Sequence, residues 1–354
     1  MTALKILVTD ASGFIGQALI VKMLEQGHHI MAVYNPLAAI ERSSFFSEQS
    51  DLSELKLDLC NQQELRQHLS SCDCVVHFAP THQATLSEQF EFAIRSTQTL
   101  LQACIEAQVK KFIHISSTAV YGDPPSGVIT EESPCLASIR PQISIKQAAE
   151  KIVLETESSD TEMIVLQMGK VYGPGERGET AQTFSQMKVA FMPLARRGTG
   201  YCNPIYIDDV VTAMIRACET PNLHRQRFII SHEQPISWRE FLSGYESILG
   251  EKTFIDLPID YCCKSQDSIP LFRELASNIL KKRKVMEATI AIAKAVYGKS
   301  IHYPSPDEFR TLVAQPIFSN QKSRDHLNFK PEISLQTGME RIREWWCQQS
   351  VETL

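Results

Sequence analysis

The stretch that decides the fold is Thr9-Asp10-Ala11-Ser12-Gly13-Phe14-Ile15-Gly16, near the start of a chain of 354 residues. It follows a short β-branched run, Lys5 to Thr9, and opens a segment, Phe14 to Gln26, with apolar residues at helical spacing. Gly13 lets the backbone approach a diphosphate, and Gly16 lets a helix pack closely on a sheet. The helix N-terminus adds amide donors and the positive end of its dipole. This strand–turn–helix context predicts a dinucleotide-binding turn.

One position of the turn departs from the usual glycine pattern. Asp10 stands where the first glycine is normally found. Aspartate tolerates left-handed backbone geometry better than most residues, so we expect the turn to form. Its negative charge lies near the predicted phosphate position and should weaken anion binding. The alternative is a tight turn that binds no ligand.

The first half of the chain alternates apolar strand-like runs with segments of helical period. Continuous apolar strands separated by helices are typical of a parallel sheet that is covered on both faces. The pattern therefore predicts an α/β fold, a doubly wound parallel sheet of the Rossmann type. The expected strands after the first are His29–Val33, Leu55–Leu59, Cys74–Phe78, Lys111–Ser116 and Met163–Gln167, and the expected helices are Glu64–Leu69, Phe90–Ala107 and Gln147–Glu157.

The alternation of strands and helices loosens after Val171, which indicates a change in domain organisation. We expect a dinucleotide-binding domain over residues 1–172, to which residues 205–230 return. Residues 173–354 then form mainly a smaller C-terminal lobe that binds the substrate. Two helices of this lobe are predicted over Trp238–Leu249 and Leu335–Trp346.

Composition narrows the possible partners. The formal net charge of -6 disfavours nucleic-acid binding, which needs a basic surface. No apolar run reaches the roughly 18 residues of a membrane span, so we expect no transmembrane segment. The N-terminal residues lack a signal-peptide pattern, and the ten cysteines have neither disulfide nor zinc-ligand spacing. We therefore expect a cytoplasmic protein with buried thiols and no metal site.

Several short motifs occur in a characteristic order along nearly the whole chain. After the glycine turn come Leu57-Asp58-Leu59, His77-Phe78-Ala79-Pro80, the run from Ser116 to Gly122, Val171-Tyr172-Gly173-Pro174-Gly175, and Tyr206-Ile207-Asp208-Asp209-Val210. Together they resemble the extended short-chain dehydrogenase/reductase family. This branch includes sugar-nucleotide epimerases, dehydratases and 3β-hydroxysteroid-type dehydrogenases.

The resemblance implies a nicotinamide dinucleotide as cofactor. Tyr34 and Asn35, at the end of the second strand, do not choose between NAD and NADP, because neither is the acidic or basic residue that makes this choice. The resemblance also implies a possible homodimer through the helices Phe90–Ala107 and Gln147–Glu157. The implied cofactor contacts are Asp10, Ser12, Gly13, Phe14, Ile15, Gly16, Tyr34, Asn35, Asp58, Leu59, Phe78, Ala79, Pro80, Lys146 and Val171.

The catalytic pattern implied by the resemblance is incomplete. The family uses a serine with a Tyr-x-x-x-Lys pair, in which the tyrosine transfers the proton. Ser117 falls on the serine position and Lys146 on the lysine position, but Gln142 stands in place of the tyrosine. No tyrosine occurs between Tyr121 and Tyr172, and a glutamine amide does not transfer protons near neutral pH.

Two functions remain open on the sequence. The first is an NAD(P)-dependent oxidoreductase or epimerase/dehydratase-like enzyme that acts on a hydroxyl or carbonyl small molecule with a non-standard proton donor. The second is a non-redox relative: a lyase or isomerase, or a weakly active protein that senses nucleotides or binds a partner. We expect Tyr121, Tyr172 and His114 to pack in the core rather than to act chemically.

Overall fold

The computed structural model of the chain describes residues 3–34, 50–79, 85–122, 126–138, 140–176, 178–256, 300–301 and 306–352. Internal contacts divide the chain into two compact units. Unit 1 comprises Met1–Gly173, Asn203–Gln234 and Ile317–Ser334, and unit 2 comprises Pro174–Cys202, Pro235–Pro316 and Leu335–Leu354.

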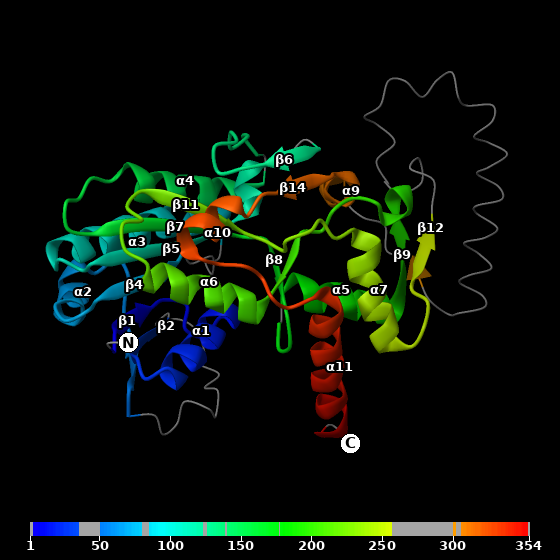
Figure 1. The fold of residues 1–354 in the computed structure, drawn as a ribbon, viewed down its shortest axis with the longest axis horizontal. Helices are drawn as coiled ribbons and strands as arrows, with labels where there is room; N and C mark the ends of the chain where they lie inside the picture. The colour runs from blue at the N-terminus through cyan, green and yellow to red at the C-terminus, as the bar shows by residue number, and fades with distance from the viewer. Residues whose placement is uncertain are drawn as a thin grey trace. The chain divides into compact units, whose positions relative to one another are not determined.

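Unit 1 is built on a seven-stranded sheet in which every neighbouring pair of strands is parallel (Figure 1). The chain order reverses between β1 and β4, which is the arrangement of a doubly wound sheet. The predicted fold class is therefore confirmed. From one edge to the other the strands are β3 (Leu52–Lys56), β2 (His29–Tyr34), β1 (Lys5–Val8), β4 (Cys74–Phe78), β5 (Lys111–Ser117), β7 (Glu162–Met168) and β11 (Gln226–Ile230).

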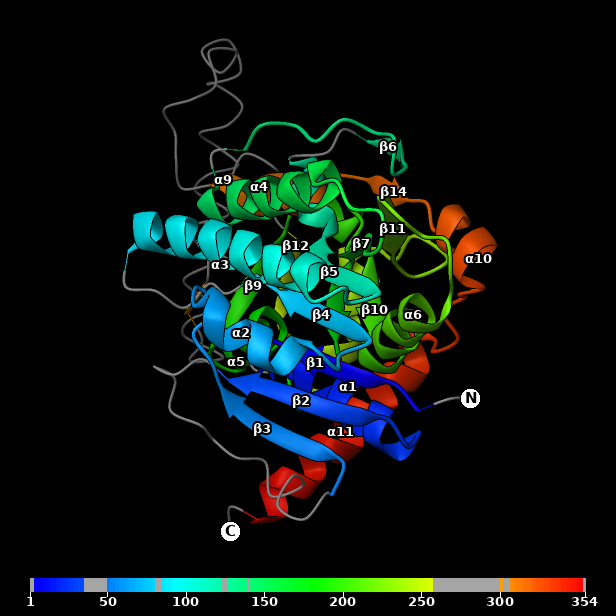
Figure 2. The same cartoon turned by 90° about the vertical axis from the view of Figure 1, so that its left-hand side faces the viewer.

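Helices cover both faces of this sheet (Figure 2). On one face α3 contacts both α2 and α4, and on the other α1 contacts α6. The central strands are buried along almost their whole length because both of their faces are covered. The helices are α1 (Phe14–Glu25), α2 (Gln62–Leu69), α3 (Leu86–Glu106), α4 (Pro141–Glu155) and α6 (Ile207–Glu219).

Smaller elements complete unit 1. They are the 3-10 helix η2 (Thr118–Tyr121), the pair β8 (Lys170–Tyr172) and β10 (Pro204–Tyr206), the pair β6 (Gly127–Ile129) and β14 (Pro316–Phe318), and α10 (Gln321–Leu327). The late segment is held by Asp209 on α6, whose two carboxylate oxygens accept the backbone amides of Glu332 (2.9 Å) and Ile333 (3.1 Å). Asp209 therefore has a structural role in unit 1.

Several predicted elements begin at the wrong residue: α3 begins at Leu86 instead of Phe90, α2 and β7 begin one or two residues early, and the shifts of β3 and α4 have clear physical reasons. The strand expected over Leu55–Leu59 lies at Leu52–Lys56, because β3 is an edge strand whose mostly exposed side chains lack an apolar run. The helix expected over Gln147–Glu157 begins at Pro141, which occupies the first helical position, where its fixed φ is favourable. Strand β4 and the helix over Trp238–Leu249 match their predicted bounds.

Unit 2 contains an aromatic cluster between its helices. The ring of Phe184 lies 5.4 Å from Tyr245 and 4.8 Å from Trp346, and the Lys188 ammonium lies 3.8 Å from the centre of the Trp346 ring. The unit comprises α5 (Glu179–Val189), α7 (Trp238–Leu249), α9 (Pro306–Val313), α11 (Leu335–Glu352), the parallel strands β12 (Phe254–Asp256), β9 (Ala190–Leu194) and β13 (Ser300–Ile301), and the turn η3 (Ala195–Gly198).

A buried chain of hydrogen bonds crosses unit 1 beneath α3. The Thr97 hydroxyl donates to the carbonyl of Ala93 (2.7 Å), so it accepts from Nε2–H of His77 (2.9 Å). On the other side of the ring, the Phe78 amide donates a hydrogen bond to the Thr9 hydroxyl (2.9 Å). The Thr9 hydroxyl can in turn donate a hydrogen bond to Nδ1 of His77 (3.1 Å). These bonds assign a neutral imidazole, and burial lowers the pKa of His77 to about 3.

His114 lies beside His77 without such partners. The two residues pair across β4 and β5, and their ring centres are 5.6 Å apart. Among the described residues, neither ring nitrogen of His114 has a hydrogen-bond partner. Burial, His77 and Lys146 all lower the pKa of His114. The expectation that His114 is a core residue is confirmed.

We expect His114→Leu to raise the free energy of unfolding at pH 7 by about 1 kcal/mol, because it removes two buried nitrogens that lack partners. Its effect should also depend on pH. The folded pKa of His114 lies below the unfolded value, so protonation favours the unfolded chain as the pH falls below about 6.5. The loss of stability between pH 7 and 5.5 should therefore be about 1 kcal/mol smaller in the variant.

Urea unfolding at both pH values measures these effects. His77→Leu is the matched control and should destabilise the protein at pH 7, because it removes the partner of Thr9 and Thr97. A clear loss of stability at pH 7 in His114→Leu would contradict the account.

Candidate functional site

The turn between β1 and α1 adopts the geometry that the sequence predicts. Asp10 has a positive φ of 51°, which confirms the expected left-handed backbone. Its carbonyl accepts the amide of Gly13 (2.9 Å), while the amide of Ala11 donates to the carbonyl of Val33 on β2 (3.2 Å). The turn is thereby fixed both to itself and to the neighbouring strand.

The two glycines of the turn lie against Asp10. A Cβ on Gly16 would collide with the backbone carbonyl of Asp10, and a Cβ on Gly13 would collide with the Asp10 carboxylate, which is the movable end of a side chain. The backbone therefore fits a site for close anion approach at the first turn of α1. The Asp10 carboxylate already lies against Gly13, so it places a negative charge beside this helix N-terminus.

The expected adenosine contacts lie on neighbouring strands and loops of unit 1. Tyr34 ends β2 and donates its hydroxyl to Glu54 on β3 (3.1 Å). Asp58 is exposed and accepts the amide of Cys60 (2.9 Å), while the following Leu59 is buried. Since β1, β2 and β4 are adjacent and parallel, their carboxyl ends lie side by side.

The other expected cofactor contacts divide into described and undescribed residues. Phe78, at the end of β4, Ala79 after it, and Val171 on β8 are half-buried. At the turn itself, Ser12 is exposed, and Phe14 and Ile15 are half-buried at the start of α1. Asn35 and Pro80 lie outside the described residues.

The expected catalytic residues occupy the end of β5 and the first two turns of α4. Ser117 is half-buried and caps η2, because its hydroxyl accepts the amide of Ala119 (3.2 Å), the second residue of η2. Gln142 is exposed at the second position of α4. Lys146 is half-buried and follows one turn later, so Gln142 and Lys146 share a helix face.

Neither neighbouring tyrosine is arranged as a substitute proton donor. Tyr121 is 1% exposed and donates its hydroxyl to Oε1 of Gln167 (2.7 Å), and burial raises its pKa. Tyr172 is also 1% exposed, with its ring 5.5 Å from that of Tyr206. The prediction that both pack in the core is confirmed.

Sequence reasoning missed the residues that hold α4 in place. The side-chain amide of Gln147 donates to the carbonyls of Val120 (2.6 Å) and Leu136 (2.8 Å). Glu150 is buried against Gln167 on β7. The spacing of Lys146 and Glu150, four residues apart on one helix, is the sequence signal that could have drawn attention to Glu150.

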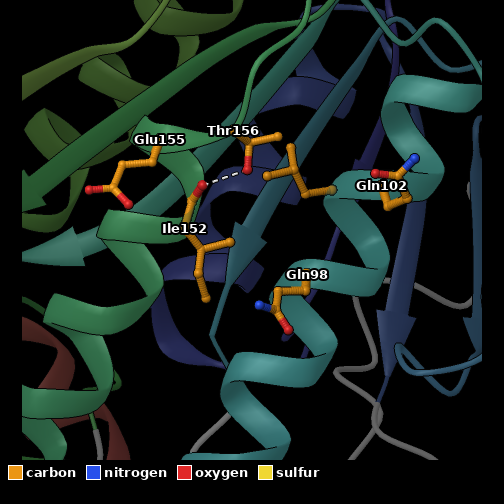
Figure 3. Close-up of a pocket in the computed structure, with 6 residues that line it drawn as sticks. Gln98, Gln102, Ile152, Glu155 and Thr156 are labelled. Carbon is orange, nitrogen blue, oxygen red and sulfur yellow. Dashed lines mark hydrogen bonds between the residues drawn. The ribbon is translucent and has the colours of Figure 1, made fainter.

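A separate hollow of about 440 Å³ lies between α3 and α4 (Figure 3). It is lined by Gln98, Leu101, Gln102, Ile152, Glu155 and Thr156. Glu155 is nine residues beyond Lys146, or about 13 Å along the helix axis at 1.5 Å per residue. The hollow is therefore distinct from the site at the start of α4.

In the described ranges, no group of three or more His, Cys, Asp or Glu side chains is arranged to hold a metal ion. No helix in the same ranges is both long and apolar enough to cross a membrane.

Of the described cysteines, Cys135 and Cys347 are exposed and Cys60 is half-buried, which corrects the expectation of buried thiols. The others, Cys72, Cys74, Cys104, Cys202 and Cys218, are buried.

Comparison with known proteins agrees with the motifs and the fold. The chain is 21% identical to 2-alkyl-3-oxoalkanoate reductase of Stenotrophomonas maltophilia over 96% of this chain and 98% of that protein. It is 24% identical to UDP-arabinose 4-epimerase 1 of Arabidopsis thaliana, over 80% of this chain and 75% of the relative.

A solved structure shares the fold along the whole chain. UDP-glucuronic acid 4-epimerase from Bacillus cereus, in complex with UDP-glucuronic acid and NAD, superposes with a TM-score of 0.70. The match has 24% sequence identity and covers 98% of this chain and 100% of that chain. The model of the NAD dependent epimerase/dehydratase family matches residues 6–230, which is more than half of the chain. The chain therefore belongs to the NAD dependent epimerase/dehydratase family.

Proposed function

We propose that this protein binds NAD(H) or NADP(H) in unit 1 and acts as an oxidoreductase or epimerase/dehydratase-like enzyme on the hydroxyl or carbonyl group of a small molecule. The observation that carries the proposal is the placement of the glycine turn, Ser117 and Lys146 in one unit. The turn follows the carboxyl end of β1, and Ser117 is the last residue of β5; these two strands lie on either side of β4. Ligands of doubly wound sheets bind at this edge, where the strand order reverses.

Each residue has a distinct part in the proposed site. The backbone amides at the start of α1 bind the diphosphate, and Lys146 holds the ribose hydroxyls beside the nicotinamide. Ser117 orients the reacting oxygen of the substrate. When bound, the nicotinamide cofactor supplies or accepts hydride. The NAD that is present in the Bacillus cereus epimerase complex supports this choice of cofactor class.

The proton donor in the proposed reaction differs from the family tyrosine. Gln142 holds the corresponding position and is exposed, but an amide does not titrate near neutral pH. Tyr121 and Tyr172 are buried, and burial raises the pKa of Tyr121 further from neutrality. The proton therefore comes from water, from the substrate or from a different side chain.

The cofactor assignment is tested by titrating the protein with NADH and with NADPH while nicotinamide fluorescence is followed. We expect saturable binding of at least one nucleotide, and we expect Lys146→Met to weaken it by roughly tenfold, the loss of a charge-assisted hydrogen bond. Lys22→Met is the control, because Lys22 lies in the last turn of α1 and pairs with Glu25 (2.9 Å).

The titration can contradict the proposal in two ways. If neither nucleotide binds at high micromolar concentrations, the proposed function is wrong. If binding occurs but Lys146→Met and Lys22→Met bind equally well, Lys146 does not hold the cofactor.

A second test concerns the charge of Asp10. A carboxylate beside the N-terminus of α1 competes with a phosphate for the same positive helix end. We expect Asp10→Asn to tighten NADH binding by about two- to fivefold, and asparagine also tolerates the left-handed backbone. Glu25→Gln, at the far end of α1, should leave the affinity unchanged. A weaker affinity in Asp10→Asn would show that the carboxylate assists binding.

We also propose that the protein forms a homodimer through α3 and α4. Leu86 and Phe90 lie one turn apart on α3 and are 52% and 40% exposed, and the hollow of Figure 3 lies between the two helices. Burial of such apolar side chains would favour association. Sedimentation velocity should show a dimer for the wild type and a monomer for Phe90→Asp. Val128→Asp, on β6, is the control because Val128 is also exposed. A monomeric wild type would contradict the proposal.

A further inference from the structure

Two buried thiols meet where β4 begins and α6 ends. Cys74 is the first residue of β4, and Cys218 is the penultimate residue of α6, 144 residues later in the chain. The two residues are 1% and 5% exposed, and their sulfur atoms are 3.7 Å apart. The first residue of a parallel strand lies at the amino edge of the sheet, whereas the proposed cofactor site is at the carboxyl edge. The thiol pair is therefore separate from that site.

The hydrogen bond between the two sulfurs gives them different chemical roles. The Cys74 thiol donates to the sulfur of Cys218. This hydrogen bond and burial raise the pKa of Cys74, so Cys74 keeps its proton. A donated hydrogen bond stabilises negative charge on the accepting sulfur. Cys218 is therefore the sulfur of the pair that can act as the nucleophilic thiolate.

A positive charge lies beside the same two residues. The Lys111 ammonium donates to the carbonyls of Ala217 (3.0 Å) and Thr220 (2.5 Å), which flank Cys218 in the chain. Lys111 is also the residue of β5 that lies opposite Cys74 in the sheet. A cation close to a cysteine favours its thiolate form. The position of Lys111 thus supports the reactive form of Cys218.

The acids next to the two cysteines in the chain are bound to other cations. The Asp73 carboxylate, before Cys74, pairs with the Lys110 ammonium at 2.8 Å. The Glu219 carboxylate, after Cys218, pairs with the Arg216 guanidinium at 3.7 Å. These pairs offset the negative charges that would otherwise oppose a thiolate.

A third buried thiol nearby is directed at the backbone instead. Cys72 donates to the carbonyls of Cys74 (3.0 Å) and Lys5 (3.4 Å), and burial raises its pKa to about 12. Cys72 therefore serves as an internal comparison for the pair: it is buried in the same region, but its thiol contacts oxygen atoms.

We propose that Cys74 and Cys218 form an oxidation site, at which a peroxide converts the two thiols into a disulfide that joins β4 to the last turn of α6. The Cys218 thiolate attacks the peroxide, the O–O bond breaks, and Cys218 becomes a sulfenic acid as hydroxide leaves. The hydroxide takes the Cys74 proton. The Cys74 thiolate then attacks the Cys218 sulfur and the S–O bond breaks.

The two steps balance without any further reactant. The second hydroxide takes up the proton that Cys218 released when it became a thiolate. Two thiols and one peroxide thus give one disulfide and two waters. The two sulfurs together lose two electrons, and the peroxide gains them.

The reaction requires a local movement at the end of α6. The sulfurs must approach from 3.7 Å to about 2.05 Å, the length of a disulfide bond. Helix ends fray more readily than central strands open, so this movement falls to the last turn of α6 rather than to β4. The same opening admits the peroxide to Cys218.

Disulfide mapping of the full-length protein tests the proposed site. The reduced, folded protein is treated with hydrogen peroxide, remaining thiols are alkylated in urea, and unreduced peptides are identified by mass spectrometry. We expect a Cys74–Cys218 peptide that lacks two hydrogens, while Cys72 is recovered as an alkylated thiol. A link of either cysteine to Cys72, or a Cys74–Cys218 link that forms only in the unfolded chain, would overturn the proposal.

Trapping of the sulfenic acid with dimedone tests the two roles. In Cys74→Ser, Cys218 has no thiol to resolve it and should carry the adduct. In Cys218→Ser, the adduct on Cys74 should be at least about fivefold weaker, because Cys74 keeps its proton. Cys72→Ser is the matched control and should form the Cys74–Cys218 disulfide at the wild-type rate. Equal adducts in the first two variants would overturn the assignment of Cys218 as the nucleophile.

Urea unfolding measures the consequence of the bridge for stability. A link between residues so far apart in the chain restricts the unfolded state, so the oxidised protein should unfold at a higher urea concentration than the reduced protein. A reductant should reverse this shift, and Cys74→Ser should not show it. Equal midpoints for the oxidised and reduced wild type would overturn the stabilising effect of the bridge.

Discussion

The contact between the Asp10 carbonyl and the first turn of α1 is the constraint on which the candidate site depends. The left-handed backbone at Asp10 points this carbonyl at the amide of Gly13 and brings it against Gly16. A side chain at Gly16 would collide with the backbone carbonyl of Asp10, so α1 can start at this angle only with glycine at that position, whereas a side chain at Gly13 would have to displace the Asp10 carboxylate. The direction of α1 then aims its N-terminus at the carboxyl edge of the sheet. An aspartate preserves this geometry but adds a negative charge where the geometry favours an anion.

A buried polar row continues from this turn across the sheet. Thr9 and His77 belong to a completed chain of hydrogen bonds, and His114 continues the row on the next strand without a partner. Ser116, two residues beyond His114, lies opposite Gln167 on β7. Polar groups that are buried beneath the covering helices lower the stability of the fold unless they have hydrogen-bond partners. The side chains of this row lie in one layer, which extends from the glycine turn toward the region around Lys146.

The main elements of the fold could be predicted because their signals are local. The glycine turn, the apolar run of β4 and the periodicity of α1 each reflect a short stretch of sequence. The edge strand β3 was misplaced because pairing on one side leaves its polar residues exposed. The start of α4 was missed because Ile143 and Ile145 interrupt the expected helical pattern, although both are buried.

The candidate site could be predicted only in part. The positions of Ser117, Gln142 and Lys146 were implied by the resemblance to the family's serine and Tyr-x-x-x-Lys motifs, and these residues lie at the end of β5 and the start of α4. The contacts of Glu150 with Gln167, and of Gln167 with Tyr121, join residues from three elements. No local pattern encodes such contacts, because they depend on how α4 and β7 pack in three dimensions.

The most direct test of the central claim is a crystal structure of the full chain grown without added nucleotide and then with NADH. The account predicts dinucleotide density in at least the second crystal, with the diphosphate at the amides that open α1 and the nicotinamide ribose beside Lys146. A nucleotide bound elsewhere, or a turn that stays free of nucleotide at saturating NADH, would contradict it.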